Sequence, residues 1–204
     1  FTDTQKAISY SMTSFFTTGG IRGGKKKLDK FYPRSFNMGI RRDVYERLGG
    51  FSKMRFGEDI DFSIRIFKAG CSCRLFPKAW VWHKRRTDFR KFWRQVYNSG
   101  IARINLYKKY PESLKLVHLL PMVFTVGCAL LAFLFLLGIL LFFILPSGMM
   151  QAVGLGLSIL ALQPLILYSF LIFADATSKN HNAKIGLLSV ASAFIQLIGY
   201  GCGF

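Results

Sequence analysis

The sequence predicts an α/β region followed by an all-α membrane region of three helices, because the chain divides into two chemically different parts. Residues 1–118 carry 26 of the 28 lysines and arginines and 9 of the 10 acidic residues, a net charge of +17. Residues 119–204 are almost uncharged, with Asp175, Lys179 and Lys184 alone. Strand-like and helix-like patterns alternate in the first part, whereas the second consists of long apolar stretches. Intrinsic disorder is excluded by the high aromatic and aliphatic content.

The apolar part predicts three membrane spans, at residues 119–145, 149–174 and 185–204 within a region from 118 to 204. At about 1.5 Å per residue these stretches reach roughly 40, 39 and 30 Å, which matches a hydrocarbon core of about 30 Å. The first connector, at residues 146–148, is a tight uncharged turn. The second, at residues 175–184, is expected to be a polar loop. Positive-inside logic places the basic region and this second loop in the cytoplasm.

Short elements alternate in the basic part. Residues 36–40, 73–76 and 79–82 have strand-like patterns, the last two separated by a proline. Residues 43–48 and 58–69 predict helices, since each begins at an acidic residue and ends at glycine. Together these segments predict an α/β arrangement for residues 1–86.

A longer helix is predicted from Thr87 or Asp88 to about Lys109, in a connecting region of residues 87–117. It is amphipathic, basic and aromatic, and it precedes the first span. Such a helix suits an anionic membrane surface, so we expect a membrane-interface role for four of its residues. These are Arg90, Trp93, Arg94 and Gln95. An ordinary amphipathic helix packed on its own domain is the alternative. Fusion to three spans favours lipid or nucleotide phosphates over nucleic acid as the partner of the positive charge.

Three carboxylates stand in four residues at the start of the second predicted helix: Glu58, Asp59 and Asp61. Helix N-terminal amides and nearby arginines favour ionised carboxylates, which could serve as bases or metal ligands. In a regular helix, however, Asp59 and Asp61 point about 200° apart and cannot clamp one ion. Taken alone, the cluster is a weak signal, and acidic residues capping a helix N-terminus are its default explanation.

The order of several short motifs adds to this pattern. Asn37 is followed by Gly49-Gly50-Phe51, then Gly57-Glu58-Asp59-Ile60-Asp61, Pro77 and Val81-Trp82-His83-Lys84. Over residues 14–120 this order resembles the C-terminal half of the catalytic domain of a family-two, GT-A-type glycosyltransferase of the bacterial membrane-bound kind. The resemblance implies a partial GT-A fold for residues 1–86, a multi-pass protein of the bacterial cytoplasmic membrane, and a catalytic part in the cytoplasm.

By this resemblance, Asp59 matches the general base that takes the proton from the acceptor hydroxyl. Glu58 is its partner and helps to hold the acceptor. Gly49 and Gly50 match a loop that approaches donor and acceptor closely, and Asn37 faces the acceptor site.

The resemblance also assigns His83, which matches a histidine that contacts a divalent ion or the donor diphosphate. Arg94-Gln95 occupies the place of the Gln/Arg-Trp motif of processive relatives, but the motif itself is missing. We therefore do not expect processive polymer synthesis.

The function implied is inverting transfer of a sugar from a nucleotide-sugar donor to a lipid-linked or cell-envelope glycan acceptor. The resemblance also implies a divalent ion, Mg or Mn, bound mainly by an N-terminal half that the chain is expected to lack, so the chain alone is expected to be inactive. The alternative is a non-enzymatic, membrane-anchored basic module that binds anionic lipid or a protein partner.

Overall fold

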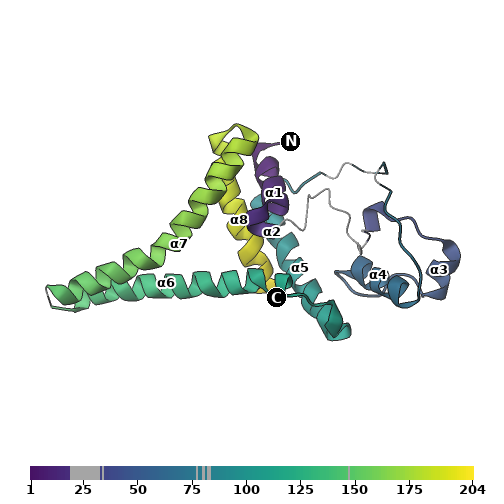
Figure 1. Ribbon diagram of the computed structural model, residues 1–204, viewed down its shortest axis with the longest axis horizontal. Coiled ribbons are helices and arrows are strands. Elements are labelled where there is room, and N and C mark those ends of the chain that lie inside the picture. The colour runs from purple at the N-terminus through teal and green to yellow at the C-terminus, as the bar shows by residue number, and fades with distance from the viewer. Residues whose placement is uncertain (19–32, 34, 77, 80, 82–83, 147) are drawn as a thin grey trace.

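The computed structural model describes residues 1–18, 33, 35–76, 78–79, 81, 84–146 and 148–204. Figure 1 shows a helical hairpin, α6 and α7, extending to one side, and the short helices α3 and α4 on the other side, with α1, α5 and α8 between them. The helices are α1 Asp3–Thr13, α2 Phe15–Thr18, α3 Arg42–Arg47, α4 Glu58–Lys68, α5 Phe89–Lys109, α6 Leu120–Ile144, α7 Met149–Asn180 and α8 Ala183–Gly203, with 3₁₀ turns at Ser35–Asn37, Pro111–Ser113 and Leu116–His118.

The predicted α/β class is wrong for this structure, because the described residues contain no strand and no sheet. Residues 35–37 form a 3₁₀ turn where a strand was expected. Residues 37–40 and 73–76 instead line one cavity, together with Ala79. The alternating pattern is present in the sequence, but the backbone ladder that defines a strand does not form among the described residues.

Three helices are long and apolar enough to cross a membrane, which indicates a membrane protein. At about 1.5 Å per residue, the 25, 32 and 21 residues of α6, α7 and α8 reach roughly 38, 48 and 32 Å. The predicted polar loop at 175–184 is largely helical, because α7 continues to Asn180. Asp175 pairs there with Lys179 at 2.8 Å, one helical turn away. The connection to α8 is a turn at His181, which has φ 50°, and Asn182, whose side chain caps α8.

Helix α1 packs against the membrane helices. A reciprocal cap between Thr2 and Gln5 fixes its start. The buried Ser11 hydroxyl bonds to Ser192 of α8 at 2.8 Å, and the Tyr10 hydroxyl donates to Asp175 of α7 at 2.5 Å. Polar side chains on α7 and α8 therefore find their partners on a helix that lies outside the candidate spans.

Helix α5 connects the short helices to the membrane helices. On one side, Leu106 and Tyr110 form a buried cluster with Ile60 and Ile64 of α4. On another side, α5 crosses α8 so closely that a Cβ on Gly100 would overlap the α8 backbone at Tyr200 and Gly203. Because one helix makes both contacts, α4 and the last candidate span are held against the same support.

Candidate active site

The start of α4 lies against α5. Gly57 caps α4 with φ 83°, a left-handed conformation that favours glycine. A Cβ at this position would be 3.3 Å from the Cβ of Ala102 on α5. The first turn of α4 therefore faces α5 at short range, and the side chains of Glu58 and Asp59 emerge beside that helix.

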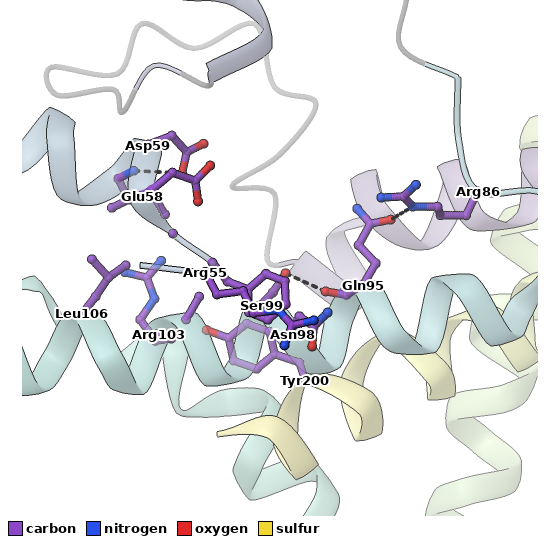
Figure 2. Close-up of a pocket in the computed structure, with 14 residues that line it drawn as sticks. Arg55, Glu58, Asp59, Arg86, Gln95, Asn98, Ser99, Arg103, Leu106 and Tyr200 are labelled. Atoms are coloured by element: carbon purple, nitrogen blue, oxygen red, sulfur yellow. Dashed lines mark hydrogen bonds between the residues drawn. The ribbon is translucent and has the colours of Figure 1, made fainter. Parts of the chain in front are cut away.

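Glu58 and Asp59 line a cavity of about 410 Å³ between the α4 start, α5 and the end of α8. Figure 2 shows the two carboxylates on the same turn, with Tyr200 entering from α8. One oxygen of Asp59 accepts a hydrogen bond from the Ile60 amide at 2.8 Å. Both side chains are only partly buried. The pair can thus meet a ligand that enters the cavity.

The opposite wall comes from α5 and the segment before it. One side of α5 presents polar side chains at successive turns, namely Gln95, then Asn98 and Ser99, then Arg103. The Gln95 side-chain oxygen accepts a hydrogen bond from Arg86 at 3.1 Å, which fixes the amide toward the cavity rim (Figure 2). The wall thus offers amide, hydroxyl and guanidinium groups, which suit a ligand rich in hydroxyls or phosphate.

Asp61 belongs to a different environment, although it is two residues from Asp59. Its side chain is fully buried and is bonded to Lys109 at 2.6 Å, Tyr110 at 3.0 Å and Arg65 at 3.0 Å. Burial by itself raises the pKa of a carboxyl group, but these hydrogen bonds outweigh it and the pKa of Asp61 lies below its ordinary value. The hydrogen bond between Lys109 and Asp61 also raises the pKa of Lys109. Asp61 is therefore an ionised structural group.

The glycine loop is tied to this buried group. Arg65 bonds Asp61 with Nε and uses its two terminal nitrogens to donate to the carbonyls of Leu48 at 2.5 Å and Gly50 at 2.6 Å. Gly49 and Gly50 do not line the cavity at Asp59. The glycine loop predicted from the sequence is thus connected to α4 through Arg65. Asp59 and Glu58 instead line the cavity beside α5.

The remaining predicted site residues are spread over the fold. Asn37 is exposed beside a second cavity and donates to the Ala79 carbonyl at 3.4 Å. His83 lies outside the described residues. Of the four residues expected at a membrane interface, Gln95 lines the cavity at Asp59. Trp93 packs against α8 at Gly199, and Arg90 and Arg94 are exposed on α5.

A metal cage is not formed by the part of the chain that the structure describes, since no three His, Cys, Asp or Glu side chains gather at one point there. Glu58 and Asp59 supply two carboxylates at the cavity, fewer than the oxygen ligands that a Mg²⁺ ion requires. The described residues therefore do not fit a complete divalent-ion site.

Comparison with known proteins assigns the chain to a family. The profile described as glycosyl transferase family group 2 matches residues 35–174, more than two thirds of the chain. The chain belongs to this family. The match includes α4, α5 and the cavity between them, so a role in glycosyl transfer is supported for the part that carries Asp59.

The chain is also similar to the probable glycosyltransferase YdaM of Bacillus subtilis (strain 168), with 36% identity over 59 residues. That alignment covers 29% of this chain and 14% of the relative. The matched segment is thus a small part of the relative's length. No solved structure matches the chain significantly.

Six residues that line the cavity were not predicted as site residues from the sequence: Arg55, Arg86, Asn98, Ser99, Arg103 and Tyr200. A signal existed for those on α5, because residues 95, 99, 103 and 106 recur at helical spacing beside the apolar face. No pattern in the sequence indicated that Tyr200 would line the cavity. It enters the cavity through the close crossing of α5 and α8, a long-range contact that residue spacing does not encode.

Proposed function

We propose that the chain carries the acceptor side and the membrane helices of an inverting glycosyltransferase that uses a nucleotide-sugar donor. The acceptor is a lipid-linked or cell-envelope glycan at the cytoplasmic face of the membrane. The observation that supports this most is the placement of Asp59 and Glu58 together on the wall of a cavity, in a chain that belongs to a glycosyl transferase family.

In the proposed step, Asp59 acts as the general base. Its carboxylate takes the proton of the acceptor hydroxyl as that oxygen bonds to the anomeric carbon of the sugar. The bond from that carbon to the nucleoside diphosphate breaks, and its electron pair leaves on the phosphate oxygen. Attack from the face opposite the leaving group inverts the anomeric centre. Glu58, one residue away on the same helical turn, holds the acceptor through a second hydroxyl.

The position of the cavity supports a membrane acceptor. Tyr200 belongs to α8, one of the three candidate spans, and it lines the same cavity as Asp59. An acceptor attached to lipid would thus reach the base without leaving the membrane surface. Membrane insertion of the three helices, with the basic region on the cytoplasmic side, is part of the same proposal and follows from positive-inside logic.

The test is transfer of a labelled sugar from nucleotide-sugar donors to membrane lipid or glycan by the intact enzyme that contains this chain. Asp59→Asn removes the base while preserving size and the ability to accept the Ile60 amide bond. The matched control is Asp43→Asn, at an exposed aspartate on α3 that pairs with Arg41 away from the cavity. The proposal requires that the first variant lose transfer and the second retain it.

A further inference from the structure

Helices α6 and α7 form a hairpin whose paired part has the length of a bilayer crossing. The rings of Phe124, near the start of α6, and Tyr168, in the second half of α7, have centroids 5.2 Å apart. Closer to the tip, Ser158 of α7 donates to a carbonyl of α6 at 3.1 Å. From the ring pair to the tip, residues 124–144 and 149–168 rise about 30 and 29 Å. These two stretches match a hydrocarbon core of about 30 Å.

Helix α8 lies at the open end of this hairpin. Phe194 packs on the same two rings, with centroids 5.7 and 5.5 Å away. The Leu197 carbonyl accepts a hydrogen bond from Thr125 at 3.4 Å, and Gly201 lies against the first turns of α6. The start of α8 packs against the last turns of α7. Both ends of α8 are therefore far from the hairpin tip, and α8 runs across the base of the hairpin (Figure 1). A third antiparallel span would instead end beside the tip.

Charged helices cover α8 along its length. Near its start, Lys184 pairs with Asp3 of α1 at 3.0 Å. Toward its end, a Cβ on Gly199 would be 2.6 Å from the Val96 side chain of α5. The neighbouring part of α5 carries three exposed cations, Arg90, Lys91 and Arg94. If α8 crossed the bilayer, α1 and α5 would enter the hydrocarbon with it, and charged side chains at that depth are costly.

The outward apolar surface divides in the same way. Within the most apolar stretch of each helix, 6% of α6 is buried, 17% of α7 and 39% of α8. Large apolar side chains such as Leu130, Phe133 and Ile159 are exposed along the hairpin, whereas on α8 Leu187 is the exposed large apolar side chain. The length and composition of α8 also suit a span, but its packing leaves little apolar surface for lipid.

Tyr200 gives a further reason. It lines the same cavity as Asp59, which the proposed function assigns to the cytoplasmic face. If α8 crossed the bilayer from Ala183, Tyr200 would lie about 26 Å further along the helix and near the opposite face. A crossing α8 would therefore separate two residues that the structure holds at one cavity.

Building on the membrane placement in the proposed function, we propose that α6 and α7 alone cross the bilayer and that α8 lies along its cytoplasmic surface. The surface that meets the lipid headgroups is then formed by α8 together with α1 and α5. The hairpin tip is on the far side of the membrane, and residues 201–204 are on the same side as Asp59.

Cysteine labelling tests this arrangement. Cys202 is exposed near the end of α8 and is kept as the single thiol of the full chain. Two matched single-cysteine variants, made with Cys202→Ser, are Ala183→Cys at the exposed start of α8 and Met149→Cys at the exposed hairpin tip. In all three, alanine replaces the other cysteines, Cys71, Cys73 and Cys128. A membrane-impermeant maleimide is applied to right-side-out vesicles and to inverted vesicles, which expose the cytoplasmic face.

The two ends of α8 are expected to label from one face. Cys202 and Ala183→Cys should react in inverted vesicles and stay unlabelled in right-side-out vesicles, and Met149→Cys should do the reverse. Labelling of Cys202 from the same face as Met149→Cys, or from the face opposite to Ala183→Cys, would overturn the proposal.

Fluorescence quenching measures the depth of α8 directly. A fluorophore is attached to Ala191→Cys in the middle of α8 or to Phe133→Cys in α6, both exposed positions. A nitroxide on the lipid headgroup is expected to quench the first more strongly, and a nitroxide at the acyl-chain end the second. Stronger quenching of the α8 fluorophore by the acyl-chain nitroxide would overturn the proposal, including in the case that Cys202 reacts only in detergent. Failure here is distinct from failure of the proposed function, because loss of transfer in Asp59→Asn does not depend on the face at which α8 ends.

Discussion

Asp59 and Asp61 lie two residues apart on the first turn of α4 and face opposite environments. Asp59 lines the cavity between α4, α5 and α8, whereas Asp61 is fully buried against Lys109, Tyr110 and Arg65. The angular separation of about 200° expected for residues two apart in a helix accounts for this difference. One acidic cluster therefore supplies a candidate base and a structural anchor.

The anchor role predicts that Asp61→Asn destabilises the fold by about 3 kcal/mol. The substitution removes the buried negative charge that pairs with Arg65 and Lys109. The thermal unfolding midpoint of the chain in detergent, followed by tryptophan fluorescence, measures the effect. Asp43→Asn removes an exposed carboxylate and should leave the midpoint unchanged. Equal midpoints for the two variants would contradict the structural role of Asp61.

The same anchor predicts a dependence of stability on acid. The pKa of Asp61 is lower in the folded chain than the value of about 3.9 in an unfolded chain. Its stabilisation is therefore fully present above about pH 4 and is lost as the pH falls through the folded pKa. The difference in melting temperature between wild type and Asp61→Asn should be constant between pH 5 and 7. This range begins about one pH unit above the pKa of an aspartate in an unfolded chain. The difference should narrow below about pH 4, and a gap that stays constant into that range would refute the assignment.

Arg65 predicts a local effect on the glycine loop. Arg65→Lys keeps a positive charge near Asp61 but cannot donate to the carbonyls of Leu48 and Gly50 together. Amide hydrogen exchange at residues 48–51 should then be about ten-fold faster, the factor that corresponds to loss of about one hydrogen bond. Arg42→Lys, at an exposed ion pair on α3, is the matched control and should not alter exchange in this loop. Unchanged exchange in Arg65→Lys would show that the loop is held by other contacts.

The crossing of α5 and α8 predicts different outcomes for two glycine substitutions. Gly100→Ala places a methyl group against the α8 backbone, which cannot rotate away, and should cost about 1–3 kcal/mol of stability. Gly127→Ala, on α6, has no atom within 4 Å of the added Cβ and should be neutral or slightly stabilising. Thermal unfolding of both variants in detergent measures the difference. If Gly100→Ala melts with the wild type, the helices do not cross as closely as described.

Local patterns predicted much of this structure from the sequence. Helices α3, α4 and α5 begin close to the expected residues, since acidic residues or glycine stand at their starts, and the three apolar helices follow from charge-free stretches. Asp59 and Glu58 were singled out through the family resemblance, and the structure places both on the wall of one cavity, while their catalytic roles stay predictions.

Features that depend on distant contacts were not predicted. Residues 36–40 alternate like a strand in the sequence, but residues 37–40 line a cavity and have no partner strand in the part of the chain that the structure describes. Helix α7 runs past Asp175 because Lys179 and Tyr10 compensate that charge. Tyr200 reaches the cavity only through the α5–α8 crossing, which no local pattern records.

The most direct measurement is the rate of sugar transfer by the intact enzyme with Asp59 and with Asp59→Asn, at equal membrane insertion. If Asp59 is the general base, kcat/KM should fall by about 100-fold to 10,000-fold, with Asp43→Asn close to wild type. The helical content and melting temperature of Asp59→Asn should stay near those of the wild type, because Asp59 lies on a cavity wall and outside the hydrogen-bonded group that Asp61 forms with Lys109, Tyr110 and Arg65. Transfer that persists in Asp59→Asn within a few-fold of the wild-type rate would contradict the account.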